Sequence, residues 1–179
     1  MRAAVWVIGT SHRFQARTHW TSNSEQEQFK TLVRDAVLTH LALAIAEETS
    51  HEANAKEGVQ STICDEVSQE VFGTCALYVD PDNAERVALG IADVTVIRAE
   101  LRDARGRIAD AEIAAKERAV RCSDQKRERE WIRRLRGHNR FPVLLVCGAD
   151  HVQSFCTQAG KHGLTVEIVV KDWEPTHQG

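Results

Sequence analysis

The sequence predicts an α/β protein, with a three-layer domain built around a mostly parallel sheet of four to six strands. Short apolar runs alternate along the chain with longer segments in which apolar residues recur at helical spacing. Uniformly apolar strands joined by helices are typical of a parallel sheet covered on both faces. No linker or low-complexity segment interrupts the pattern, so we expect a single domain over residues 1–179.

Apolar runs mark the predicted strands. The run 41–46 is rich in alanine and leucine, which also favour helix, but His40 interrupts the preceding pattern and acids follow directly. We therefore interpret it as a buried parallel strand. In chain order, the predicted strands are residues 3–8, 41–46, 75–79, 142–147 and 164–170.

The first helices are predicted from capping residues and apolar spacing. Ser24 and Glu27 have the spacing of a capping box at the start of a helix. Apolar residues at every fourth position indicate a second helix over 63–71, and Gly73 is the expected stop. Asp82 is the expected cap of a short helix after the third strand.

Residues 91–136 form a long, mainly helical segment before the penultimate strand, which we expect to be an insertion or a flap beside the sheet edge. Gly106 predicts one interruption, and the polar stretch 122–124 predicts a second. The last helix of the segment is expected to stop at Gly137. A further helix, capped by Asp150, then leads to the last strand.

The composition restricts the class of protein. The net charge of −3 argues against a nucleic-acid or membrane surface partner, and the basic residues within 98–136 are interleaved with acids, as on a solvated helix face. The N-terminus lacks the pattern of a signal peptide, and apolar runs are too short to span a bilayer. Five cysteines without a CxxC pair favour reduced thiols, so we expect a cytoplasmic protein.

One short motif, Gly-x-x-His, follows two of the predicted strands. Its copies are residues 9–12 and 148–151. A glycine at a strand end allows the backbone to turn sharply, and a histidine three residues later can point across the carboxyl edge of the sheet. If the two strands are neighbours, His12 and His151 point toward one place.

Acidic residues end the two strands that lie between these motifs along the chain. Glu47 and Glu48 follow the second predicted strand, and Asp80 follows the third. Parallel sheets bind ligands outside the carboxyl ends of their strands, so these acids and the two histidines can share one site. Taken singly, each residue is equally an ordinary loop, turn or helix-start residue, and only their convergence favours a functional site.

Two imidazoles and a carboxylate suit a divalent transition metal, with positions left open for water and substrate. We predict His12, Glu47 and His151 as the ligands of Mn, Co, Zn or Fe. Such an ion lowers the pKa of its bound water and polarises a carbonyl or phosphoryl oxygen. Glu48 or Asp80 is then the expected proton-transfer group, and the choice of Glu47 or Glu48 as the inward residue stays open.

The paired motifs and the strand-end glutamate resemble the Tiki/TraB superfamily, which includes ChaN-like haem-iron proteins and erythromycin-esterase-like enzymes. Those families often carry an arginine–acid pair on the helix before the second motif. Arg127-Glu128 looks like this pair, with Arg129-Glu130 as the other register. The segments that carry the resemblance are residues 7–12, 44–47 and 144–151.

The resemblance implies a metal-binding α/β domain with His12, Glu47 and His151 near its centre. Some relatives are metal-dependent proteases, whereas others are esterases or binding proteins, so the substrate does not transfer. Residues 50–125 match no family pattern.

The sequence therefore predicts a metal-dependent hydrolase that acts on an ester, a peptide or a related small substrate. Arg127 would stabilise developing negative charge, and Glu48 or Asp80 would move protons. The alternative is a non-catalytic protein that binds a metal or small ligand in the same pocket. Binding of DNA or RNA by the basic helices of 98–136 is a third interpretation, which the net charge weakens. The oligomeric state is left open, a homo-oligomer included.

Overall fold

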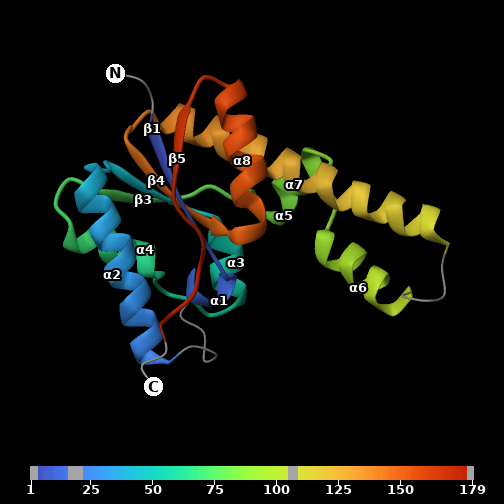
Figure 1. The fold of residues 1–179 in the computed structure, drawn as a ribbon, viewed down its shortest axis with the longest axis horizontal. Coiled ribbons are helices and arrows are strands. Elements are labelled where there is room, and N and C mark those ends of the chain that lie inside the picture. Colours follow the sequence, from blue (N-terminus) through green and yellow to red (C-terminus); the bar gives the residue numbers. More distant parts are fainter. Residues whose placement is uncertain (1–3, 16–21, 105–108, 177–179) are drawn as a thin grey trace.

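A five-stranded sheet forms the centre of the molecule, and the computed structural model describes residues 4–15, 22–104 and 109–176. The strands are β1 (Ala4–Thr10), β2 (Ala44–Glu47), β3 (Cys75–Tyr78), β4 (Val143–Gly148) and β5 (Thr165–Trp173). They lie in the order β3-β2-β4-β1-β5, and every neighbouring pair is parallel (Figure 1). The predicted α/β class, with a mostly parallel sheet of four to six strands, is confirmed.

Helices connect successive strands and supply the two outer layers. The helices are α1 (His12–Gln15), α2 (Asn23–His40), α3 (His51–Lys56), α4 (Ile63–Glu70), α5 (Asn83–Ala88), α6 (Val94–Ala104), α7 (Asp110–His138) and α8 (Ala149–Lys161). No helix in these described ranges is long and apolar enough to cross a membrane.

The apolar core is divided by the sheet into two parts. On one face, Trp131 and Leu135 of α7 and Phe155 of α8 pack against Val7 and Leu145 of the central strands. On the other face, side chains of α1, α2 and α4 pack against the alternate residues of the same strands. This second cluster includes Phe14, Phe29, Val33, Ile63, Val67, Ile8 and Leu144. Strands covered on both faces explain why β4 is buried along its whole length.

The helical segment before β4 extends away from the sheet. In Figure 1, α6 and the first half of α7 run side by side to one side of the molecule, and the second half of α7 returns to the sheet. The predicted helical interruption at Gly106 lies outside the described residues. The second predicted break, at 122–124, is wrong because α7 continues through it. Ser123 lies within the helix and donates a hydrogen bond from its hydroxyl to the carbonyl oxygen of Ala92, 2.8 Å away.

Several helix ends differ from the predicted ones by one or two residues. The capping box of α2 is formed by Ser22 and Glu25 and not by Ser24 and Glu27. Asp150 does not cap α8, whose N-cap is Gly148 without a side-chain bond.

The second strand is also shorter than predicted. The prediction of a strand over 41–46 was right in type, but Leu41 adopts a left-handed conformation that ends α2, so β2 begins only at Ala44. α7 in turn passes the predicted stop at Gly137 and ends at His138, before Asn139 in the left-handed conformation.

Candidate functional site

The two Gly-x-x-His motifs end neighbouring strands. β1 pairs with β4 in a register that places Gly9 opposite Cys147 and Thr10 opposite Gly148. Both chains then turn directly into helices, α1 after the first motif and α8 after the second. The motifs therefore lie side by side at the carboxyl edge of the sheet, where ligands of parallel sheets bind.

Both histidines approach one carboxylate, that of Glu48. Oε1 of Glu48 lies 3.8 Å from Nε2 of His12 and 3.3 Å from Nε2 of His151. Its Oε2 accepts a hydrogen bond of 2.7 Å from the backbone N–H of Gly148. Because Gly148 is the N-cap of α8, this carboxylate lies at the positive end of the helix. Glu48 is therefore the residue that joins the two motifs.

Arg127 of α7 connects Glu48 to Asp80. Its Nη2 donates to Oε1 of Glu48 at 2.7 Å, and its Nε donates to Oδ1 of Asp80 at 2.9 Å. Arg86 and the indole N–H of Trp131 also donate to Asp80. Burial raises the pKa of Asp80, but the charges and hydrogen bonds of Arg127 and Arg86 outweigh it and hold that pKa below its ordinary value. Arg127 and the two carboxylates thus form a buried, charged network.

His151 is held in place from its other side by Glu128. Nδ1 of His151 lies 2.9 Å from Oε1 of Glu128, whose carboxylate also accepts hydrogen bonds from Ser154 and Gln158. Since a carboxylate oxygen only accepts, Nδ1 carries a proton and Nε2 faces Glu48 and Arg127. Burial lowers the pKa of His151, but the bond to Glu128 and the charge of Glu48 outweigh it and raise that pKa.

His12 is the exposed histidine of the pair. Its side chain is 63% exposed, against 5% for His151. Nδ1 of His12 lies 3.0 Å from the amide oxygen of Gln15, one turn further along α1. With Nδ1 as the donor to this oxygen, Nε2 is the acceptor nitrogen of the ring and lies on the side of Glu48. His12 is therefore a mostly exposed imidazole whose Nε2 lies near the carboxylate of Glu48.

Glu47, the neighbour of Glu48, lies in a different environment. Its Oε2 accepts a hydrogen bond of 2.6 Å from the hydroxyl of Thr62, and its Oε1 is buried without a hydrogen-bond partner among the described residues. Burial raises the pKa of Glu47 to about 8, although the bond from Thr62 acts in the opposite direction. Glu47 is therefore largely a neutral acid at neutral pH.

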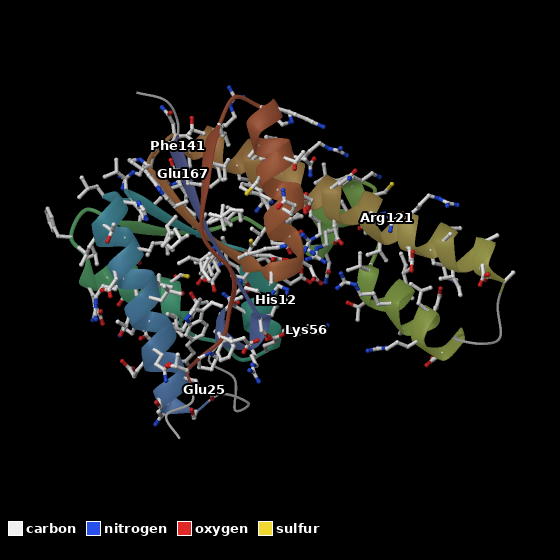
Figure 2. The ribbon with its side chains drawn as sticks, in the orientation of Figure 1. His12, Glu25, Lys56, Arg121, Phe141 and Glu167 are labelled. Carbon is white, nitrogen blue, oxygen red and sulfur yellow. The ribbon has the colours of Figure 1, made fainter. Side chains whose placement is uncertain are left out.

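A cavity of about 360 Å³ lies at this edge of the sheet. Figure 2 shows His12 near the end of α3 at Lys56, whereas Phe141, which precedes β4, lies toward the opposite end of the sheet. Of the predicted site residues, five line the cavity, and His151 lies behind Glu48. The charged and polar lining residues are His12, Gln15, Glu47, Glu48, Thr49, Asn54, Glu57, Thr62, Asp80, Arg86, Thr95, Arg98 and Arg127.

The predicted metal ligands do not form a ready coordination sphere. Among the residues that the structure describes, no group of three or more histidine, cysteine, aspartate or glutamate side chains is arranged to hold a metal ion. Glu47 bonds to Thr62, whereas His12 and His151 approach Glu48. Nη1 of Arg127 lies 3.5 Å from Nε2 of His151, and this fixed positive charge opposes a divalent ion at that nitrogen. The donor set as arranged does not fit a metal, which stays a prediction from the sequence.

Sequence reasoning did not assign several residues that complete the site. Glu128 is the acid of the arginine–acid pair, but its bond to His151 was not expected. Gln15 follows His12 at one-turn spacing, which is the only sequence signal for its role. Of the two registers left open, Arg127 is buried in the site and Arg129 is exposed. Arg98 reaches the cavity from α6, a segment with no recognisable motif.

Comparison of this chain with protein-family models, with curated proteins and with solved structures finds no match in any of the three sets. The resemblance of its motifs to the Tiki/TraB superfamily therefore rests on the quoted residues alone.

Proposed function

We propose that this chain is a hydrolase of small ester, peptide or related substrates, with its active site in the cavity beside His12. The proposal rests on two chemically different groups that line one cavity. One is the solvent-facing base His12, and the other is the buried acid Glu47 with an unpartnered oxygen. A volume of about 360 Å³ suits a small molecule.

His12 is the expected general base. Gln15 fixes the proton on Nδ1, so Nε2 can take a proton from a water molecule in the cavity. The water oxygen then attacks the carbonyl carbon of the substrate. Glu48, 3.8 Å from the same nitrogen, stabilises the imidazolium that forms. His12 and Glu48 thus act as a base and its supporting carboxylate.

Glu47 is the expected general acid. With a pKa of about 8 it is protonated at neutral pH, and the bond from Thr62 to Oε2 places the proton on the unpartnered Oε1. Because Oε1 is buried, Glu47 has to turn toward the cavity when substrate binds, and transfer of its proton to the leaving oxygen or nitrogen then accompanies cleavage of the scissile bond. The imidazolium of His12 then releases its proton to solvent, and Glu47 takes one up, so that the site returns to its starting state.

Arg127 has a supporting role in this scheme. Its Nε and Nη2 are already engaged by Asp80 and Glu48, so its main effect is to fix the position of Glu48 next to both histidines. The sequence-based role for Arg127, stabilisation of a developing anion, would then fall to Nη1, which lies 3.5 Å from Nε2 of His151. The predicted divalent metal would have to displace the guanidinium from Glu48, and we derive no step through it.

The decisive experiment is a hydrolysis panel with matched variants. Purified protein is assayed with esters, peptides and phosphoesters, and its metal content is measured. We expect His12→Ala and Glu47→Gln each to lower activity by roughly 10²–10⁴-fold, the usual contribution of a positioned acid or base. His138→Ala, an exposed histidine at the far end of α7, is the control and is expected to keep full activity.

The outcomes separate the hydrolase from the binding protein that uses the same pocket. Turnover that survives in both His12→Ala and Glu47→Gln contradicts the proposed roles. A small molecule retained through purification, without turnover in any class of the panel, favours the binding protein. The ion pairs of Arg127 with Glu48 and Asp80 favour the binding protein, because they keep the cavity formed in the absence of substrate.

The proposal includes a reducing, cytoplasmic location. All five cysteines are free, and Cys147 is fully buried, with a pKa that burial raises well above the ordinary thiol value. Unpaired thiols of this kind are typical of proteins in reducing compartments. Measurement of free thiols in protein purified without reductant tests this part of the proposal.

A further inference from the structure

The cavity is lined by three arginines in very different states. Arg127 is bound by Glu48 and Asp80, and Arg86 donates to Asp80 and to the carbonyl oxygen of Pro81. Arg98 makes no hydrogen bond to any residue that the structure describes. Its guanidinium lies 3.7 Å from a carboxylate oxygen of Asp124 and 4.0 Å from one of Asp150, and its side chain is 48% exposed.

Arg98 is also placed to meet a ligand in the cavity. Val94, Thr95 and Arg98 line the cavity from the first turns of α6, at a spacing that puts them on one face of the helix. The hydroxyl of Thr95 and the guanidinium of Arg98 are both hydrogen-bond donors. Glu47, which is 1% exposed and has one unpartnered oxygen among the described residues, lines the same cavity from β2, so the space holds unsatisfied polar groups on two sides.

We infer that the substrate carries an anionic group, a carboxylate or a phosphate, that Arg98 and Thr95 bind while the scissile bond lies beside His12. This inference rests on the proposed function and names its substrate class. An oxyanion is the partner that a guanidinium with free donors binds best, because two N–H groups can meet two oxygens at once. Arg86 and Arg127 are already bound to the buried carboxylate of Asp80, and turning either one toward an anion would remove part of the positive charge that compensates it.

The acids near Arg98 set the strength of this binding. Asp124 also lies 3.7 Å from Arg127, and the side chain of Asp150 is 86% exposed. Neither carboxylate is within hydrogen-bond distance of Arg98, so an anion does not have to displace a formed bond. Their negative charge weakens the attraction at long range, and we expect millimolar binding of a simple anion.

The test uses simple anions as probes, so it does not require a known substrate. Inorganic phosphate and acetate are titrated separately into ¹⁵N-labelled protein, with potassium chloride at equal ionic strength as the blank. We expect one of the two anions to shift the backbone amide signals of Thr95 and Arg98, and the stronger of them identifies the class. Arg98→Gln is expected to weaken this binding by about tenfold or more. Arg102→Gln, an exposed arginine one turn further along α6, is the matched control and is expected to bind as wild type does.

The outcomes distinguish this inference from the proposed function. Equal binding by wild type and Arg98→Gln, or no shift with either anion at tens of millimolar, overturns the inference even where His12→Ala abolishes hydrolysis. Binding that depends on Arg98, in a protein without turnover, supports the anion site and counts against the hydrolase. If the protein hydrolyses these esters, Arg98→Gln should raise KM for 4-nitrophenyl succinate, which carries a carboxylate, and leave KM for 4-nitrophenyl acetate unchanged.

Discussion

The two Gly-x-x-His segments have the same spacing and end paired strands, but they are built differently. His151 is buried, begins a helix of thirteen residues and is held by Glu128 on one nitrogen. His12 is mostly exposed, begins a helix of four residues and, among the residues that the structure describes, hydrogen-bonds to Gln15 on the same turn. Glu48 lies between them and within 4 Å of both.

This difference separates a positioning histidine from a reactive one. A buried imidazole with a fixed partner on each side keeps Glu48 and Arg127 in place, whereas an exposed imidazole can exchange protons with solvent and meet a substrate. The repeated motif thus gives the cavity one accessible wall at His12 and one rigid support at His151, behind Glu48. The two copies should therefore respond differently to substitution.

The glycines of the two motifs should tolerate substitution very differently. A Cβ added to Gly9 would lie 2.0 Å from the backbone oxygen of Lys171 in β5 and 2.5 Å from a methyl group of Val152. β5 would have to move, so we expect Gly9→Ala to lower the free energy of unfolding by about 3 kcal/mol or more. A Cβ on Gly148 would meet the exposed ring of His12 at 2.9 Å, and Gly148→Ala should stay within about 1 kcal/mol. Urea denaturation of both variants measures the difference, and equal losses would show that the motifs are packed alike.

Removal of the histidines should give the next largest contrast. His151→Ala leaves a buried gap and takes a partner from Glu128, so we expect a loss of about 2–3 kcal/mol in stability. His12→Ala removes a mostly exposed ring, and water can replace it beside Gln15 and Glu48, so stability should change by less than about 0.5 kcal/mol. Thermal and urea unfolding are measured beside activity. A His12 variant that is destabilised as much as the His151 variant would contradict the division into reactive and positioning residues.

The fold was predictable in outline because strands covered on both faces must be apolar throughout. The runs 3–8 and 142–147 correspond to β1 and β4 on this ground alone. The false break at 122–124 had a different cause. Ser123 weakens a helix when it is considered alone, but its partner is the carbonyl of Ala92, which the chain brings near only after folding.

The location of the site was predictable from the sequence, but the hydrogen bonds and ion pairs within it were less so. Strand-end reasoning placed His12, Glu48 and Asp80 around one cavity edge, and the family resemblance added Arg127; the structure has all four side chains lining one cavity. Strand-end reasoning could not decide which way Glu47 points, because neighbouring residues at a strand end reach different surroundings. The bond of His151 to Glu128 depends on how α7 packs against α8, and no local spacing encodes this contact.

The pH dependence of stability should reveal the bond between Glu128 and His151. The pKa of His151 is raised in the folded protein, so the stabilisation is fully present below the ordinary value of 6.5 and is lost as the pH rises through the folded pKa. Glu128→Gln keeps the size of the side chain but weakens its bond to the imidazolium by about 1 kcal/mol. We expect the wild-type advantage over Glu128→Gln to be largest near pH 6 and to shrink toward pH 8. A difference in unfolding free energy between the two proteins that stays constant from about pH 6 to pH 8 would show that folding does not shift the pKa of His151 through Glu128.

The smallest expected effect on stability concerns the third residue of each motif, which is Ser11 in the first copy and Asp150 in the second. The backbone oxygen of Ser11 accepts a hydrogen bond from Phe14, whereas Asp150 extends into solvent 4.0 Å from Arg98. Asp150→Asn should therefore lower stability by no more than about 0.5 kcal/mol, through a weaker interaction with the start of α8. The same change removes a negative charge beside the proposed anion site, so the affinity for the preferred probe anion should rise by about two- to threefold. Ser11→Ala is the matched variant and should leave that affinity unchanged. An Asp150 variant that binds the anion no better than wild type would mean that Asp150 does not influence the cavity, and that the second motif contributes only the support of Glu48 by His151.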